Sequence, residues 1–338
     1  MCLLQDKINY LIYEYYSHDW TFDEIQEIFH RPLLDLVAEA ATVHRQNHNY
    51  REMELSTLIS IKTGGCPEDC AYCAQSARYQ TYVDEPQEMS REQIIARAAE
   101  LKAKGVPRVC LSAAWRQLPP NRFDEILEII GILKSMGMKV CLTMGRLTAD
   151  QAKQLAKAGI TAYNHNIDTS ERFYSKIITT RTFRSRLDTI HRLIDAGVPH
   201  CSGGIIGLGE SDEGRTSMLH TLATLPKHPY TVPINALMPI EGTPLANNKP
   251  VTSWELIRVI ATTRIVMPAT HIELAAGRIQ LSDEAQALCF LAGANAIFVG
   301  DRLLTAPNPN ESQDMQLLNI LGAGPVKSPM KEQPVANN

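Results

Sequence analysis

Three cysteines lie within one short stretch of the chain, Gly64-Gly65-Cys66-Pro67-Glu68-Asp69-Cys70-Ala71-Tyr72-Cys73. An isolated cysteine is usually a small core hydrophobe, but thiols at this spacing, on a glycine- and proline-containing turn, favour a soft metal site. Zinc and four-iron sites normally take four ligands, and no further cysteine or histidine lies close in sequence. Either a distant residue completes the site, or one metal position stays open to a small molecule.

Three more cysteines, Cys110, Cys141 and Cys201, each lie in the middle of a different predicted strand. Taken singly, each is expected to be a buried hydrophobe. In a closed barrel, however, inward side chains of different strands meet in layers. Together these thiols could therefore hold a second metal cluster inside the barrel, whereas Cys289 lies on an apolar helical face and is expected in the core.

From Ser56 onward, short apolar or β-branched segments alternate with amphipathic ones. We predict strands at 56–63, 108–114, 138–144, 160–166, 198–206, 231–238, 270–276 and 295–299. We predict helices at 90–104, 121–136, 148–158, 182–196, 212–225, 252–267 and 281–292. Such alternation indicates parallel strands with right-handed crossovers, so the predicted fold is α/β, a (β/α)8 TIM-type barrel. An open doubly wound sheet is the alternative, weakened because no Gly-x-Gly-x-x-Gly follows the first strand.

The predicted domains are an N-terminal helical cap at 1–50, the barrel at 51–322 and a disordered tail at 323–338. In the cap, Leu11, Ile12, Tyr15 and Tyr16 recur at helical spacing, and Thr21 with Glu24 forms a capping-box pattern at a second helix. The tail is rich in Gly, Pro, Lys and Asn, a composition typical of disorder.

Bulk composition narrows the class of protein. The 338 residues have a formal net charge of −4 and no basic block, which argues against nucleic acid or an anionic membrane as partner. No apolar run reaches the roughly 20 residues that span a bilayer. Eight cysteines without a recognisable signal peptide favour reduced thiols in the cytoplasm over disulfides.

The Cys-x3-Cys-x2-Cys spacing, with Tyr72 before the last cysteine, resembles the signature of radical S-adenosylmethionine (SAM) enzymes. The flanking runs 56–63 and 74–79 extend this resemblance to the biotin synthase family, over about residues 50–310. The resemblance implies that the loop cysteines hold a [4Fe-4S] cluster whose remaining iron binds SAM, with Cys66, Cys70 and Cys73 as catalytic residues.

The reaction implied by the resemblance is sulfur insertion into dethiobiotin. Reduced cluster cleaves SAM, the resulting 5′-deoxyadenosyl radical takes hydrogen from the substrate, and a sulfide of a [2Fe-2S] cluster becomes the sulfur of biotin. A homodimer reduced by a flavodoxin-type electron donor is implied as well. Two alternatives remain: a radical SAM enzyme that abstracts hydrogen without inserting sulfur, and a non-catalytic iron–sulfur or zinc protein.

The family holds its [2Fe-2S] cluster with three cysteines, matched here by Cys110, Cys141 and Cys201, and with one arginine. In this chain Glu273 stands at the position of that arginine, within Ile272-Glu273-Leu274-Ala275-Ala276-Gly277-Arg278. Three interpretations stay open: oxygen ligation by Glu273, a three-cysteine cluster with an open iron, or loss of the second cluster. Ligation by a carboxylate would lower the reduction potential, and Arg108 could offset part of the added charge.

Polar residues near strand ends are candidates for binding the small molecules. Alternation places Asn164, Asn166 and Asp168 on one face of the fourth predicted strand, although an Asn- and Asp-rich turn is the plain alternative. The resemblance assigns SAM contacts to Tyr72, Asn166, Asp168 and Arg186, and substrate contacts to Asn164, Asn166, Asn235 and Thr305. Ala306 replaces a family threonine near the substrate carboxylate, which should weaken binding by about 1 kcal/mol.

Overall fold

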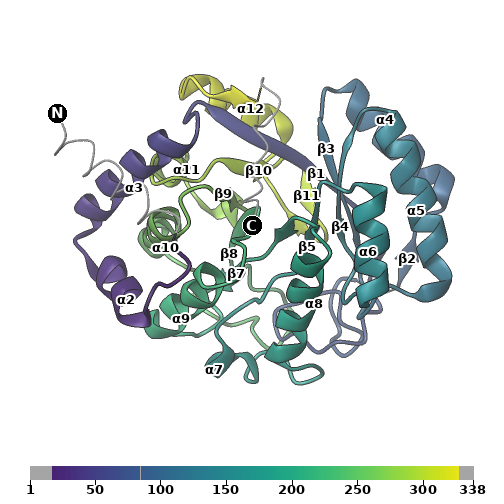
Figure 1. Cartoon of the computed structure of the whole chain (residues 1–338), viewed down its shortest axis with the longest axis horizontal. Helices are drawn as coiled ribbons and strands as arrows, with labels where there is room; N and C mark the ends of the chain where they lie inside the picture. The colour runs from purple at the N-terminus through teal and green to yellow at the C-terminus, as the bar shows by residue number, and fades with distance from the viewer. Residues whose placement is uncertain (1–16, 84, 327–338) are drawn as a thin grey trace.

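A closed barrel of parallel strands forms the centre of the computed structural model, which describes residues 17–83 and 85–326 (Figure 1). The barrel strands are β1 (Glu52–Thr63), β3 (Arg108–Ala113), β4 (Lys139–Thr143), β5 (Ala162–Asn164), β6 (His200–Cys201) continued by β7 (Gly204–Ile206), β8 (Thr231–Ala236), β9 (His271–Leu274) and β10 (Ala296–Phe298). Because β1 pairs with both β3 and β10, the sheet closes on itself. The predicted (β/α)8 barrel is confirmed, and the open doubly wound sheet is wrong.

Helices surround the strands and match the predicted ones to within a few residues at each end. They are α4 (Arg91–Ala103), α5 (Pro120–Ser135), α6 (Ala149–Ala158), α8 (Phe183–Asp195), α9 (Asp212–Ala223), α10 (Ser253–Val266) and α11 (Asp283–Leu291). Local signals explain the starts: Ser90, Thr148 and Ser282 each accept a hydrogen bond from the backbone N–H of the third helical residue. These capping side chains therefore help to fix the residue at which each helix begins.

Several short elements were not predicted. They are β2 (Gln87–Glu88), α7 (Glu171–Tyr174), the 3₁₀ helix η1 (Arg278–Gln280), the hairpin of β11 (Arg302–Leu303) and β12 (Ala306–Pro307), α12 (Glu311–Ile320) and β13 (Gly324–Pro325). Only α12 is long, and its Asn310 capping box with Gln313 was a readable signal. Since β13 pairs with β1, the chain is ordered slightly past the predicted start of the tail. The rest of that tail, 327–338, lies outside the described residues.

The N-terminal region contributes α2 (Phe22–His30) and α3 (Leu33–Asn47). Thr21 and Glu24 form the predicted capping box, whereas the predicted helix around residues 11–16 falls outside the described part of the chain. Both helices lie along the outer side of the barrel beside α9 and α10 (Figure 1). Their apolar faces merge with one large core, which includes Ile25, Phe29 and Leu36.

The interior of the barrel differs from the apolar layers between strands and helices. Barrel interiors are usually filled by bulky aliphatic side chains. Here Glu54, Ser56, Arg108 and Glu273 are all at most 6% exposed, and three cysteines pack together among them. Burying charged groups costs free energy unless they are paired, so this interior indicates a functional site.

Candidate active site

The first thiol set lies in the loop that follows β1. Gly64 has φ +79°, which favours glycine, and a Cβ there would lie 2.9 Å from Val83 Cγ1. The loop then folds back on itself: the backbone N–H of Cys66 donates to Gln75 O at 2.9 Å, and that of Ala77 donates to Cys66 O at 2.8 Å. The chain therefore turns tightly at the carboxyl end of β1, the end at which barrel enzymes carry their sites.

Two acidic residues of this loop anchor it to the segment before α8. Asp69 accepts hydrogen bonds from the backbone N–H groups of Thr179 at 2.9 Å and Thr180 at 3.1 Å. Burial opposes ionisation of Asp69, but these hydrogen bonds outweigh it and lower the pKa of that carboxyl. Glu68 is buried, accepts a hydrogen bond from the hydroxyl of Thr180 and pairs with Arg181 at 3.9 Å. Sequence reasoning missed these anchors, because their partners lie about a hundred residues away.

Two of the three loop thiols, Cys70 and Cys73, lie in surroundings that disfavour the thiolate. Burial raises the pKa of Cys70, and burial together with the neighbouring Cys70 raises the pKa of Cys73 to about 12. Among residues 17–83 and 85–326, no three His, Cys, Asp or Glu side chains converge as a single metal ion would require. A cluster has no such requirement, because each thiolate binds a different iron. The three thiols of this loop are therefore compatible with an iron–sulfur cluster.

Beside the loop lies a buried ion pair between Arg186 of α8 and Asp168, which follows β5. The Arg186 guanidinium also donates to Asn166 O at 2.8 Å and to Tyr174 Oη at 2.9 Å. Burial alone would lower the pKa of Arg186, but Asp168 outweighs it, so the side chain stays charged. Arg186 is 5% exposed, so it is a buried arginine although it lies on a helix.

Tyr72 lies close to this pair and to the thiols. Burial raises the pKa of its hydroxyl, and the negative charges of Asp168 and Cys70 add to the rise. Asp168 itself has φ +67°, a left-handed conformation that is strained for a residue other than glycine. The structure thus brings the residues predicted to bind SAM to one side of the cysteine loop.

The side-chain amides of the three asparagines predicted to bind substrate differ in how many hydrogen bonds they already make within the protein. Asn166 Oδ1 accepts from Gly203 N at 3.1 Å. Asn235 uses both ends of its amide, donating to Gly204 O at 3.0 Å and accepting from Ala276 N at 3.1 Å. In the described part of the chain, Asn164 Oδ1 is buried with no hydrogen-bond partner. A buried acceptor of this kind normally has a donor, so Asn164 has spare capacity for a ligand.

Thr305 lies in the turn of the β11–β12 hairpin, next to Ala306. Its carbonyl accepts a hydrogen bond from Tyr82 Oη at 2.9 Å, which ties the hairpin to the segment after the cysteine loop. A cavity of about 430 Å³ opens between these segments. Its lining residues are Thr63, Tyr82, Val83, Glu85, Gln87, Arg302, Leu304 and Thr305.

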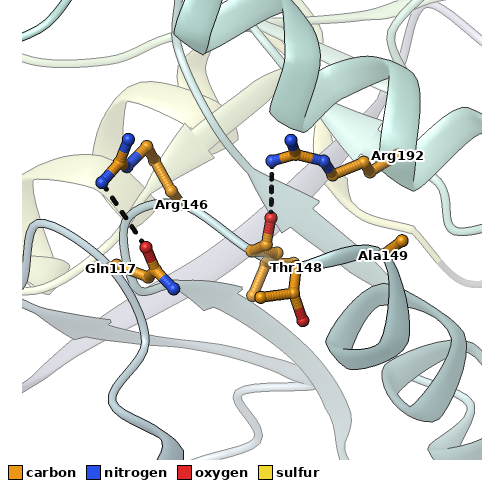
Figure 2. Close-up of a pocket in the computed structure, with 6 residues that line it drawn as sticks. Gln117, Arg146, Thr148, Ala149 and Arg192 are labelled. Carbon is orange, nitrogen blue, oxygen red and sulfur yellow. Dashed lines mark hydrogen bonds between the residues drawn. The ribbon is translucent and has the colours of Figure 1, made fainter.

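A second cavity, of about 390 Å³, lies at the start of α6 (Figure 2). Its two arginines are already engaged: Arg192 donates to Leu147 O at 2.9 Å, and Arg146 approaches Gln117 Oε1 at 3.5 Å. Figure 2 shows these side chains around the opening. None of the residues predicted for cofactor or substrate lines it, so it is separate from the candidate active site.

The second thiol set lies inside the barrel. Cys110 of β3 and Cys141 of β4 are register partners, and Cys201 of β6 packs with them around Ala162. All are at most 5% exposed. Burial raises the pKa of each thiol, that of Cys110 to about 12. The cysteines therefore point inward and meet, as the barrel prediction required.

One cation, Arg108, reaches this thiol set. Its Nε lies 2.9 Å from Cys141 Sγ, and its Nη2 lies 3.9 Å from Cys201 Sγ. Glu54 holds the guanidinium from the opposite side at 3.0 Å, and the ring of Tyr230 lies 5.3 Å from its Cζ. Sequence reasoning missed Glu54, although alternation in β1 places it on the same face as Ser56.

Glu273 faces the same interior from β9. It is 5% exposed, and burial raises its pKa to about 7, while Arg108 and Ser56 oppose the rise. Glu54 takes the ion pair with Arg108. Within the described ranges, Glu273 has no Lys, Arg or His nitrogen within 4.0 Å of its carboxylate.

Comparison with known proteins agrees with this picture. A family model described as the Radical SAM superfamily matches residues 60–222. A second, described as the Biotin and Thiamin Synthesis associated domain, matches residues 233–323. The first match ends before β8, and the second begins within β8 and covers the barrel strands that follow it.

Similar proteins over nearly the whole chain are named biotin synthase. That of Christiangramia forsetii is 52% identical over 94% of this chain and 88% of its own length. The mitochondrial biotin synthase of Arabidopsis thaliana is also 52% identical, over 91% of this chain and 82% of its own. Among solved structures, methylornithine synthase PylB superposes with TM-score 0.76 at 19% identity, covering 91% of this chain and 94% of its own. The hydrogenase maturase HydG from Carboxydothermus hydrogenoformans superposes with TM-score 0.78 at 17% identity, covering 95% and 79%. These two structures share the fold.

Proposed function

The chain belongs to the biotin synthase family, and from this premise we propose that it inserts sulfur into dethiobiotin to form biotin. The observation that supports this best is the presence of two thiol sets in one barrel. One lies in the loop after β1, and the other lies among the inward side chains of β3, β4 and β6. A hydrogen-abstracting radical SAM enzyme needs only the first set, whereas sulfur insertion also needs a sulfur donor, which the second set could hold.

Cys66, Cys70 and Cys73 are the proposed ligands of a [4Fe-4S] cluster, with SAM on its remaining iron. Bound there, cluster and SAM supply a carbon radical able to take hydrogen from an unactivated C–H bond. The protein binds and orients the reactants. Arg186, kept cationic by Asp168, is the proposed partner of the SAM carboxylate. Its contacts with Asn166 and Asp168 support giving these residues, together with Tyr72, to the same binding site. The buried surroundings exclude water from the reacting groups.

The substrate is proposed to lie between the amides and the C-terminal hairpin. A cyclic urea both donates and accepts hydrogen bonds, which suits the amides of Asn164, Asn166 and Asn235. The unpartnered Oδ1 of Asn164 is the acceptor that a ureido N–H would satisfy. Thr305 is the proposed contact for the substrate carboxylate, and its position in the lining of the cavity near the end of β1 supports this role.

Cys110, Cys141 and Cys201 are the proposed ligands of a [2Fe-2S] cluster that supplies the sulfur. Their position within the barrel would keep the sulfide near the substrate and away from solvent. We also propose a homodimer, a flavodoxin-type reductant and a cytoplasmic location, on the family resemblance alone. No helix in the described part of the chain is long and apolar enough to cross a bilayer.

The test is an anaerobic assay in which biotin and 5′-deoxyadenosine are both quantified after reduction with dithionite. The proposal predicts both products from wild-type protein. It predicts 5′-deoxyadenosine without biotin from Cys141→Ala, and neither product from Cys70→Ala. If wild-type protein gave 5′-deoxyadenosine alone, the result would favour a radical SAM enzyme that abstracts hydrogen without inserting sulfur. The differences from the family at Glu273 and Ala306 are the reason to keep this alternative.

A further inference from the structure

Four buried groups that can bind iron share the barrel interior: the thiols of Cys110, Cys141 and Cys201, and the carboxylate of Glu273. Arg108 lies 3.0 Å from Glu54 and 2.9 Å from Cys141. Glu54 and Glu273 are both register partners of Ala296, so the two carboxylates lie at the same level of the barrel. Three thiols and one carboxylate therefore lie in the same barrel interior, each contributed by a different strand.

In the described part of the chain, no cation forms an ion pair with the buried carboxylate of Glu273. Taking such a charge out of water is unfavourable unless the charge is paired or coordinates a metal. The neighbouring cation, Arg108, is held by Glu54 at 3.0 Å and directed at Cys141 at 2.9 Å. Of its near neighbours, Ser56 offers Glu273 one hydroxyl. Since Glu54 forms the ion pair with Arg108, the carboxylate of Glu273 remains available to bind a ligand.

We propose that Glu273 is the fourth protein ligand of the [2Fe-2S] cluster, through a carboxylate oxygen, and that Arg108 offsets part of the resulting negative charge. The inference rests on the proposed function, which supplies the cluster on the three interior cysteines. A carboxylate is an ordinary ligand for iron. Because three thiolates and a carboxylate outweigh the positive charge of an oxidised two-iron core, a fixed cation stabilises the assembly.

The position of Glu273 fits this ligand role. On β9 it is the register partner of Pro233 on one side and Ala296 on the other. Neither neighbour has a polar side chain that could compete for the carboxylate. Glu273 therefore approaches the thiols from the strands that contribute no cysteine, which completes the ring of ligands around the interior.

The experiment is Mössbauer spectroscopy of the full-length chain, reconstituted anaerobically with ⁵⁷Fe and sulfide. An oxygen ligand makes one ferric site of the [2Fe-2S] cluster different from the other, so wild-type protein should give two unequal quadrupole doublets for that cluster. Glu273→Cys should retain the cluster and make the two sites alike, because a fourth thiolate replaces the oxygen. Glu273→Ala should lose most of the [2Fe-2S] iron while the [4Fe-4S] signal stays, which serves as an internal control for folding.

Glu54→Gln is the matched control, since it removes the other interior carboxylate and should keep the two iron sites unequal. If the two iron sites of the [2Fe-2S] cluster were equivalent in wild-type protein, that result alone would overturn the proposal. Full [2Fe-2S] content with an unchanged spectrum in Glu273→Ala would overturn it as well, while leaving the proposed function intact. If wild-type protein and every variant lacked a [2Fe-2S] signal, the proposed function itself would fail, and the role of Glu273 with it.

Discussion

The Nε atom of Arg108 lies 2.9 Å from the Sγ atom of Cys141, inside the closed barrel. Glu54 holds the same guanidinium at 3.0 Å, so the cation stands between a carboxylate and the thiol set. Because Glu273 adds a second buried carboxylate to this space, Arg108 is the main local source of positive charge. The electrostatics of the interior therefore depend on one residue of β3.

Replacing Arg108 with Met should destabilise the protein by about 3–5 kcal/mol, because it leaves Glu54 buried without its partner. The change should also lower the reduction potential of the [2Fe-2S] cluster, since a nearby positive charge is lost. Chemical denaturation and a redox titration measure the two effects. Arg97→Met is the matched control: its exposed pair with Glu100 on α4 should contribute only about 0–1 kcal/mol. Equal losses for both variants would contradict this account of Arg108.

The two clusters should be separable by single substitutions. Cys70→Ala should remove the [4Fe-4S] signal and leave the [2Fe-2S] signal, and Cys141→Ala should do the reverse. Cys289→Ala should keep both, because Cys289 is a residue of α11 whose side chain lies in the apolar core. Iron and sulfide analysis with electron paramagnetic resonance of reduced samples distinguishes the cases. Simultaneous loss of both signals in Cys141→Ala would argue against two independent sites.

Arg186→Met should weaken SAM binding by roughly 10–100-fold, which corresponds to a charge-assisted hydrogen bond of about 1.5–3 kcal/mol. Equilibrium dialysis on protein that carries its [4Fe-4S] cluster measures the affinity. Arg184→Met is the control on the same helix, because Arg184 is exposed and pairs with Asp188. SAM affinity should be unchanged there. An effect of equal size in both variants would exclude a direct role for Arg186.

Restoring the missing hydroxyl tests the substrate end of the site. Ala306→Thr should lower the KM for dethiobiotin by about fivefold, equivalent to about 1 kcal/mol, with kcat little changed. Thr305→Ala should raise the KM by a similar factor. If neither substitution moved the KM, the substrate carboxylate would have to bind away from the β11–β12 hairpin.

The barrel was predictable because its signals are local. Strand and helix periodicity, N-caps such as Ser90 and Thr148, and glycines at helix ends are all read within a few residues. The short elements were missed for the opposite reason. Gly324–Pro325 becomes a strand only because β1 lies beside it. The residues next to it in the sequence give no signal that predicts this pairing.

The same distinction applies to the site. The cysteine loop and the interior thiols could be identified from spacing and from strand positions. The anchors of the loop could not, since Asp69 finds Thr179 and Thr180 only after folding. Glu54 lies on the inward face of β1, but sequence alone does not say that Arg108 of β3 would meet it. Charges that pair across the barrel are visible only in three dimensions.

The central claim is that one barrel couples a radical-generating cluster to a sulfur-donating one. The most direct measurement is a single-turnover reaction under anaerobic conditions, with biotin, 5′-deoxyadenosine and [2Fe-2S] content followed in the same sample. This account predicts that biotin forms as the [2Fe-2S] signal declines and that 5′-deoxyadenosine accumulates with it. Formation of 5′-deoxyadenosine with no biotin and an unchanged [2Fe-2S] signal would contradict it.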